Sequence, residues 1–232
     1  MKLSPRLTTI LNFVPHNSIV GDIGTDHGYI PVYLIYNRIS KKVIATDISK
    51  DSLDKAKDYS KKCGLEKDIE TRVGDGLEIL KPFEVDTLII AGMGGLLINE
   101  ILDKGKKITD SVINFIFQPM GASDELRKYL INNNFKIIDE RLAREGDKYY
   151  EIIFAQRGKS YISKDIYYEI GEKLFINKDP LLKEFIIKKI EEYEKIIKYL
   201  NLGSSEKSRE REKFLQNKIE DYKEVINYYE SL

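Results

Sequence analysis

The sequence has few of the residues that cross-link a chain or hold a metal. Cys63 is the only cysteine among 232 residues, so the chain forms no internal disulfide and offers no multi-cysteine zinc site. Only two histidines are present, His16 and His27, and we therefore expect no metal ion. The longest apolar-rich stretch, "TLIIAGMGGLLI", has about a dozen residues, too few to span a bilayer.

An excess of charge of either sign is also absent, because 38 basic residues balance 38 acidic ones. Nothing in the overall composition therefore indicates a nucleic-acid partner, and any basic surface must come from a local arrangement of residues. The opening residues, "MKLSPRLTTILNF", lack the apolar stretch and the small-residue cleavage site of a secretory signal. We expect a cytoplasmic protein with no membrane association, and we favour a monomer.

From residue 19 to about 158, short apolar runs alternate with longer amphipathic ones. This alternation is typical of strands joined by crossover helices in a mostly parallel sheet. The "REGDK" segment between the last two runs predicts a hairpin and an antiparallel edge strand. We predict seven strands, at "SIVGDIG", "KVIATDI", "IETRVGD", "VDTLIIAG", "NFIFQPM", "FKIIDERLA" and "YYEIIFAQ".

After "RGKS" the sequence becomes rich in Lys, Glu, Ile and Tyr, and we place a boundary between domains 1–158 and 159–232. Apolar residues spaced by three and four predict two antiparallel helices that pack as a short coiled-coil hairpin. A solvated arm with one buried seam explains this pattern, and a partner-binding role is the alternative. The two apolar series are Leu182, Ile186, Ile190, Tyr193, Ile197 and Leu200, then Leu215, Ile219, Tyr222, Ile226 and Tyr229.

The glycine-rich turn after the first predicted strand, "GDIGTDHGYIP", differs from a dinucleotide-binding loop. Gly24 and Gly28 allow the backbone to approach a ligand closely beside the start of a helix. Asp26 would repel a pyrophosphate at that helix terminus and favours a ligand with positive charge. We therefore predict S-adenosylmethionine, which carries a sulfonium and an amino group, as the ligand of Asp22, Gly24 and Gly28.

Acidic residues also stand at the ends of the next two strands. Asp47, followed by Ile48, lies 23 residues after Gly24, where an acid accepts hydrogen bonds from both ribose hydroxyls. Asp75 and Gly76 follow the third strand, at the usual position for contacting the adenine amino group in methyltransferase sheets. Each acid alone is as often a helix cap or an ion-pair partner. Their order on successive strands predicts a donor-binding site.

Six segments together resemble a known family: "LSPRL", "DIGTDHGYIP", "ATDIS", "GDGLEIL", "IIAGMGG" and "FQPM". They are similar to the bacterial tRNA (adenine-N1)-methyltransferases that modify adenine 22 of tRNA. The resemblance covers residues 1–158 and, beyond them, rests on helical character alone. It implies a class I methyltransferase fold with a Rossmann-like seven-stranded sheet, S-adenosylmethionine as methyl donor and tRNA as acceptor.

The "AGMGG" segment ends the fourth strand, above the expected position of the donor methyl group. It lacks the acidic or amide residue followed by Pro-Pro-aromatic that is common in enzymes methylating exocyclic amines. We assign Gly92 and Met93 to the donor, and Gly94 and Gln118 to the acceptor base. The alternative is that the glycines only make a tight turn.

N1 of neutral adenine already has an in-plane lone pair, so positioning should dominate catalysis, an effect worth up to roughly 7 to 11 kcal/mol. Asp26 is the first candidate to stabilise positive charge on the adenine, with donor binding as the alternative. Tyr29 would stack on the base unless it is a buried core residue. His27 would orient the base or cap the helix.

Two rival functions use the same features: a small-molecule methyltransferase, and a noncatalytic tRNA-binding or assembly protein. A Rossmann dehydrogenase ranks last, because Asp26 occupies a glycine position of the dinucleotide fingerprint. Contacts to the RNA backbone are assigned to Lys2 and Arg6, with further contacts from Lys41, Lys42, Arg141 and Arg144.

Overall fold

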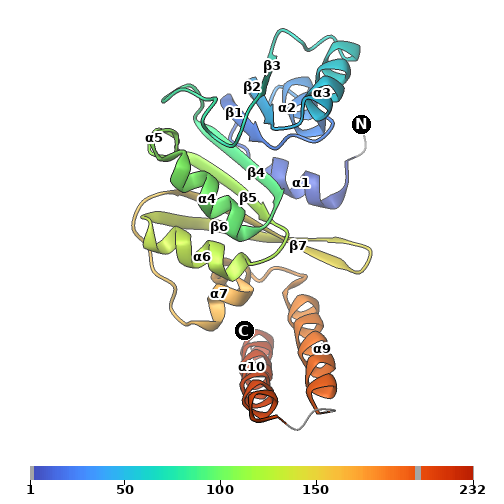
Figure 1. The fold of residues 1–232 in the computed structure, drawn as a ribbon, viewed down its shortest axis with the longest axis vertical. Helices are drawn as coiled ribbons and strands as arrows, with labels where there is room; N and C mark the ends of the chain where they lie inside the picture. Colours follow the sequence, from blue (N-terminus) through green and yellow to red (C-terminus); the bar gives the residue numbers. More distant parts are fainter. Residues whose placement is uncertain (1–2, 202–204, 232) are drawn as a thin grey trace. The chain divides into compact units, whose positions relative to one another are not determined.

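The computed structural model describes residues 3–201 and 205–231. The chain divides into two compact units, Met1–Ile162 and Ser163–Leu232 (Figure 1). Lys2, one of the predicted RNA contacts, lies outside the described residues.

One seven-stranded mixed sheet forms the framework of the first unit, in the order β3-β2-β1-β4-β5-β7-β6. The first five strands run parallel, and β7 pairs antiparallel with both β5 and β6. This arrangement confirms the predicted Rossmann-like sheet with its final hairpin. The strands are β1 (Ser18–Ile23), β2 (Ser40–Asp47), β3 (Ile69–Val73), β4 (Thr87–Met93), β5 (Asn114–Pro119), β6 (Phe135–Glu145) and β7 (Lys148–Arg157).

Helices cover both faces of the sheet (Figure 1). Successive strand residues point to opposite faces, so Leu88 and Ile90 of β4 enter one apolar core and Ile89 enters the other. Each core is closed by helices on its own side. Helices α1 (Pro5–Asn12), α2 (Tyr29–Tyr36) and α3 (Lys50–Lys62) lie on one face, and α4 (Gly95–Lys104), α5 (Lys106–Thr109) and α6 (Ser123–Asn132) on the other.

The start and end of α3 follow from local sequence signals. The hydroxyl of Ser49 accepts a hydrogen bond from the N–H of Ser52, which caps the helix as predicted. The helix stops at Cys63, and Gly64 follows with φ of +69°, a conformation that glycine adopts without strain.

Strand order reverses direction between β1 and β4, which are neighbours in the sheet. The chain leaves β1 towards β2 and β3 on one side, whereas it leaves β4 towards β5 on the other. Loops at the carboxyl ends of these two strands therefore diverge, and open α/β sheets bind ligands in the crevice at this position.

Two long antiparallel helices form most of the second unit, in agreement with the predicted hairpin. Tyr193 stacks on Tyr222 with ring centroids 5.8 Å apart, and Lys183 forms an ion pair with Glu230. Val225 is buried in place of the predicted Ile226, because residues three and four positions after Tyr222 both flank the apolar stripe. The helices are α7 (Ile166–Ile170), α8 (Glu172–Ile176), α9 (Leu182–Leu200) and α10 (Glu206–Ser231).

A buried ion cluster joins α6 to the final hairpin of the sheet. Arg127 is fully buried, and its guanidinium donates hydrogen bonds to Glu140 of β6 at 2.7 Å and to Glu151 of β7 at 2.6 Å. The hydroxyl of Ser123 also donates to Glu151, at 2.6 Å. Because an uncompensated buried charge is costly, these residues stabilise the fold only as a set.

Replacing Arg127 by Met is expected to lower the free energy of unfolding by about 3–5 kcal/mol, because it removes the cation that faces two buried carboxylates. Urea denaturation monitored by circular dichroism measures this loss. The matched control is Lys128→Met at the next position, where the exposed ion pairs contribute less than about 1 kcal/mol. Equal losses in the two variants would contradict the role assigned to Arg127.

Candidate functional site

The loop between β1 and α2 bends sharply at the carboxyl edge of the sheet. Gly24, His27 and Gly28 have φ values of +74°, +56° and +70°, all in the left-handed region. The N–H groups of Gly24 and Thr25 both donate to the carbonyl of Thr46 at 2.8 Å, which ties the loop to β2. A left-handed conformation is uncommon for a residue with a side chain, and such positions cluster at functional loops.

Asp22 lies at the base of this loop with only 4% of its surface exposed. Burial, opposed by the hydroxyl of Thr25 and supported by the nearby charge of Asp47, raises the pKa of Asp22 to about 6. A desolvated carboxylate of this kind is stabilised by a cationic ligand. The chemistry of the site therefore fits the positively charged donor predicted from the sequence.

The ends of β2 and β3 bring a second group of predicted residues together. Asp47 accepts the N–H of Ser49 at 2.6 Å, and its carbonyl accepts the N–H of Gly74 at 3.0 Å. Next to Asp47, Ile48 is 73% exposed, and Val73 at the end of β3 is also exposed. An acid beside exposed apolar side chains fits a nucleoside, whose ribose is polar and whose base has apolar faces. Val73 was not among the residues predicted from the sequence.

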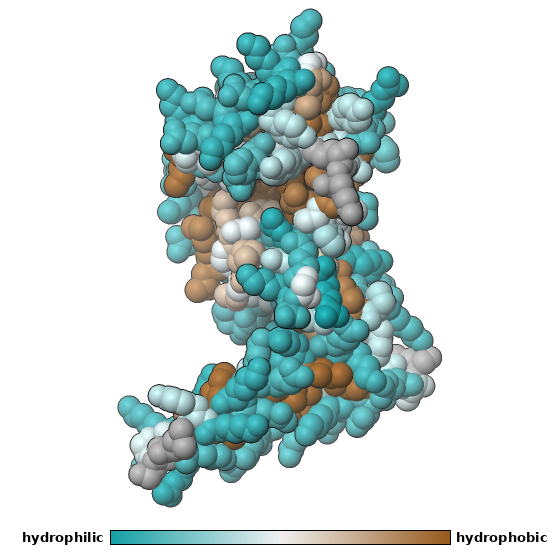
Figure 2. Space-filling view, turned by 90° about the vertical axis from the view of Figure 1, so that its right-hand side faces the viewer, coloured by the Kyte–Doolittle hydropathy of each residue, from teal (hydrophilic) through white to brown (hydrophobic). Residues whose placement is uncertain are grey.

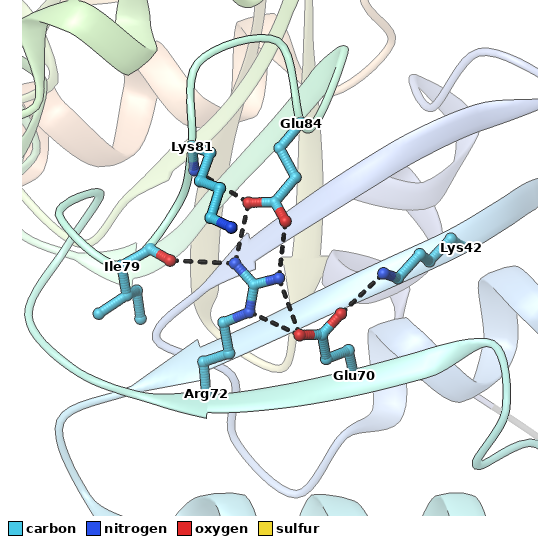
Figure 3. A network of polar contacts seen from close by, with 6 residues as sticks. All are labelled: Lys42, Glu70, Arg72, Ile79, Lys81 and Glu84. Atoms are coloured by element: carbon cyan, nitrogen blue, oxygen red, sulfur yellow. Dashed lines mark hydrogen bonds and ion pairs between the residues drawn. The ribbon is translucent and has the colours of Figure 1, made fainter.

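Asp75 and Gly76 begin the segment that joins β3 to β4, and a polar network holds the other end of this segment (Figure 3). The guanidinium of Arg72 donates to both carboxylate oxygens of Glu84, at 2.8 and 2.7 Å, and to the carbonyl of Ile79 at 3.0 Å. Hydrogen bonds from Arg72 lower the pKa of Glu84 to about 2. The network thus fixes the segment that carries Asp75 and Gly76.

Met93 joins the two glycine-rich motifs across the crevice. A Cβ atom added to Gly24 would lie 2.2 Å from the terminal methyl group of Met93, so the Met93 side chain lies directly over Gly24. Residues of the first and fourth strands therefore meet at the point where strand order reverses. This contact places Gly24, Gly92 and Met93 at one location, as a shared donor site requires.

The glycines of "AGMGG" have different roles. A Cβ at Gly95 would lie 2.1 Å from the carbonyl oxygen of Ala122, so this glycine allows close packing. Gly94 has no neighbour within 4 Å of such a Cβ, and Gly92 has φ of +78°. The tight-turn interpretation therefore accounts for Gly95, whereas Gly92 and Gly94 leave bare backbone at the edge of the sheet.

Helix α1 brings Arg6 to the same edge. Ser4 caps this helix and Pro5 occupies its first position, so the "LSPRL" segment starts a helix at a defined residue. The Nη1 atom of Arg6 donates to Oε1 of the fully buried Gln118 at 2.8 Å. The same Nη1 lies 3.9 Å from a Cβ placed on Gly92. Arg6, Gln118 and Gly92 thus form one group.

Asp26, His27 and Tyr29 line the outer rim of the β1–α2 loop. Asp26 is 79% exposed, and its carboxylate lies 3.2 Å from Nε2 of His27. The ring of Tyr29 lies 5.7 Å from that of His27 and contacts Tyr59 edge-on. Tyr29 is 43% exposed, so the interpretation of this residue as a buried core tyrosine is wrong.

Two of the predicted RNA contacts do not lie at this edge. Lys42 stands near the amino end of β2, five residues before Asp47, or roughly 16 Å along the strand. Its ammonium group pairs with Glu70 at 2.7 Å, and Lys41 is its neighbour (Figure 3). Contact of Lys41 and Lys42 with RNA stays a prediction, and it concerns a surface apart from this edge, because charge does not indicate which end of a strand a residue occupies.

The final hairpin carries two further predicted contacts and two residues that were not predicted. Arg141 pairs with Asp139 at 3.0 Å, and Arg144 stacks on Tyr149. Glu145 and Tyr150 both contact Arg6, although no local sequence signal links them to residue 6.

A cavity of about 350 Å³ lies elsewhere, in the second unit, and contains none of the predicted site residues; its walls include Asp165, Tyr167, Asp221 and Tyr228. Among the described residues, no group of three or more His, Cys, Asp or Glu side chains could hold a metal ion. Likewise, none of the described helices is long and apolar enough to cross a membrane. The carboxyl edge of the sheet is therefore the candidate site.

This sheet order, with a glycine-rich loop after β1 and an acid ending β2, defines a class I S-adenosylmethionine-dependent methyltransferase. The sequence matches the "Methyltransferase domain" family over residues 3–153. It is also 38% identical over 158 residues to the tRNA (adenine(22)-N(1))-methyltransferase of Bacillus subtilis. That alignment covers 68% of this chain and 66% of the relative.

Two solved structures are similar over nearly the whole chain. The B. subtilis m1A22 tRNA methyltransferase TrmK has a TM-score of 0.87 and 33% identity, covering 97% of this chain and 99% of that one. TrmK of M. capricolum, solved with S-adenosyl-homocysteine, has a TM-score of 0.83 and 31% identity, covering 97% and 100%. The chain belongs to the TrmK family of tRNA (adenine(22)-N(1))-methyltransferases, which confirms the family resemblance.

Replacing Arg72 by Leu is expected to destabilise the protein by about 1.5–3 kcal/mol near pH 6, because charge-assisted hydrogen bonds to Glu84 are lost. The pKa of Glu84 is lowered in the folded state, so its contribution is present above about pH 4.5 and is lost as the pH falls towards 2. The stability difference between wild type and variant should therefore shrink between pH 6 and pH 3 in urea denaturation. Lys104→Leu, which removes an exposed pair with Glu100, serves as control. A difference that stays constant with pH would exclude the role of Glu84.

Proposed function

We propose that this chain transfers the methyl group of S-adenosylmethionine to N1 of adenine 22 in tRNA. The observation that carries the proposal is the contact between Gly24 and Met93 at the carboxyl ends of β1 and β4, two residues after the buried carboxylate of Asp22. A cationic donor suits that carboxylate, and the relatives in the TrmK family bear the name of this reaction. The substrate, tRNA, places the activity in the cytoplasm.

The donor site that we propose combines the edge residues of the first four strands. S-adenosylmethionine supplies a methyl group bonded to a positively charged sulfur, which makes that methyl group an electrophile. Asp22 balances the positive charge of the donor, and Asp47 accepts hydrogen bonds from ribose hydroxyls. Ile48 and Val73 cover the faces of the adenine. The set is Asp22, Gly24, Gly28, Asp47, Ile48, Val73, Asp75, Gly76, Gly92 and Met93.

Asp26, His27 and Tyr29 are the residues that we assign to the acceptor base. Adenine gains positive charge as its N1 is methylated, and a carboxylate close to the ring stabilises that charge. Asp26 is better suited to this role than to donor binding, because it is exposed at the rim whereas Asp22 is buried. His27, 3.2 Å from Asp26, orients the carboxylate, and the exposed ring of Tyr29 stacks on the base.

Incubation of the protein with tRNA transcripts and labelled donor, followed by nucleoside analysis, tests the proposed function. A transcript with adenine at position 22 should yield N1-methyladenosine. A matched transcript that differs only by guanine at position 22 should remain unlabelled. Label in any other nucleoside, or equal labelling of both transcripts, would refute the assignment. Binding of the donor without transfer to RNA would also refute it.

Donor binding should weaken as the pH falls through about 6, because the donor binds the ionised form of Asp22. Below that pH the carboxylate must first lose a proton, which weakens affinity by about tenfold per pH unit. Isothermal titration calorimetry with S-adenosylmethionine between pH 5 and 8 measures this dependence. Asp22→Asn should bind weakly with no inflection near pH 6.

The exposed acid Asp75 provides the control for this experiment. The Asp75→Asn variant should retain the inflection that Asp22→Asn loses, because only Asp22 is buried. The assignment of Asp22 would be wrong if both variants kept the wild-type pH dependence.

A further inference from the structure

The guanidinium of Arg6 lies at the acceptor edge and contacts only neutral groups among the described residues. Its Nη1 donates to the amide oxygen of Gln118 at 2.8 Å, and its Cζ lies 5.5 Å from the centroid of the Tyr150 ring. Glu145 is the carboxylate that contacts this residue, and it accepts the backbone N–H of Arg6 at 2.8 Å, not a hydrogen bond from the side chain. Arg6 thus presents a partly buried cation without an ion pair in residues 3–201 and 205–231.

Burial raises the pKa of Glu145, but hydrogen bonds from Ser4 and the N–H of Arg6, together with the charge of Arg6, lower it overall. The guanidinium of Arg6 remains available to an anionic ligand, and the chemistry of the reaction indicates which one. The adenine ring gains positive charge on methylation, so a guanidinium held against the ring would oppose the transition state. A phosphodiester of the RNA has the opposite charge and accepts two hydrogen bonds from a guanidinium. Arg6 is therefore suited to bind the phosphate backbone of the nucleotide that enters the site, whereas Asp26 is suited to stabilise the positive charge on its adenine.

The hairpin of β6 and β7 fixes the position of Arg6. Residues Ile153–Gln156 of β7 pair with β5, whereas Lys148–Ile152 pair with β6 alone, so the hairpin extends past the end of β5 (Figure 1). Glu145 and Tyr150 stand on the two strands of this extension. Glu145 accepts the backbone N–H of Arg6 and so holds helix α1 in place. Tyr150 contacts the guanidinium of Arg6 and so restricts its position.

The surface around Arg6 supports a nucleotide site. Gly92, Gly94 and Gly121 are exposed, and no heavy atom lies within 4 Å of a Cβ placed on Gly94 or Gly121. Met120 is exposed, and its sulfur lies 3.5 Å from the amide nitrogen of Gln118. Apolar side chains also reach the surface among hydrophilic ones in the space-filling view (Figure 2). The bare backbone at Gly94 and Gly121 leaves room for a sugar, and the thioether of Met120 suits contact with a base. The cation of Arg6, beside them, suits a phosphate.

We infer that Arg6 anchors a phosphate of the target nucleotide, and that Tyr150 and Glu145 are positioning residues which hold Arg6 for this contact. The inference rests on the proposed function, because the phosphate belongs to the tRNA nucleotide whose adenine accepts the methyl group. It assigns a role in substrate binding to the final hairpin of the sheet.

Steady-state methylation of the adenine-22 transcript at several salt concentrations tests the inference, together with donor affinity and thermal unfolding. Arg6→Gln should raise KM for tRNA roughly tenfold, through loss of a charged hydrogen bond. It should also reduce the slope of log KM against log salt by about 0.7–0.9, the change expected for one phosphate contact. Donor affinity should not change, because Arg6 acts on the acceptor.

Matched pairs of variants test the positioning role. Tyr150→Leu should raise KM about two- to fivefold and reduce the salt slope, because the cation–π contact is lost. Tyr150→Phe retains an aromatic face and should restore both values. Glu145→Ala should act like Tyr150→Leu, whereas Glu145→Gln retains an oxygen that accepts the N–H of Arg6. The positioning role would be refuted if the two variants at each position had the same KM and salt slope. It would also be refuted if KM rose while the salt slope stayed unchanged.

Replacing single phosphates by uncharged methylphosphonates on either side of nucleotide 22 identifies the anion. At the contacted linkage, wild type and Arg6→Gln should have equal KM values. A persistent difference at both linkages would exclude a flanking phosphate. If wild type methylates tRNA but the variants of Arg6, Tyr150 and Glu145 have the wild-type KM and salt slope, the inference about Arg6 fails and the proposed function stands. If wild type methylates no tRNA, the proposed function fails, and the salt dependence of tRNA binding still decides the role of Arg6.

Discussion

The contact between Met93 and Gly24 is the constraint on which the site depends. Strand order reverses between β1 and β4, so the loops that follow these strands diverge, and the Met93 side chain bridges them. The Met93 side chain occupies the space that any Cβ at residue 24 would need. Glycine at this position therefore brings two motifs from distant parts of the sequence to one crevice above Asp22.

Burial distinguishes carboxylates that the sequence alone presents as equivalent. Asp22 is buried, with a pKa raised by desolvation, whereas Asp26 stands exposed beside His27. A carboxylate thus suits two ligands: the cationic methyl donor, which Asp22 would face, and the positively charged adenine, which Asp26 would face at the rim. Arg6 adds the opposite charge next to Gly92, so the same edge carries groups suited to cationic and to anionic parts of its ligands.

Features with local causes could be predicted from the sequence, and contacts between distant residues could not. Alternating apolar residues identified the strands of the sheet, and turn chemistry identified the final hairpin. The contacts of Arg6 with Glu145 and Tyr150 span about 140 positions, and no spacing or motif encodes them. Exposure of Tyr29 and the placement of Lys42 also depend on the assembled sheet.

The separation of Arg6 from Glu145 along the chain also orders events during synthesis. The donor site that we propose lies within residues 22–93, so all of its residues have been synthesised once β4 has left the ribosome. Helix α1 is made first but meets Glu145 and Tyr150 only after the hairpin has emerged. The residues of the proposed donor site are thus synthesised more than 50 residues before the two that hold Arg6, and the contact with Arg6, which joins remote parts of the chain, forms late in folding.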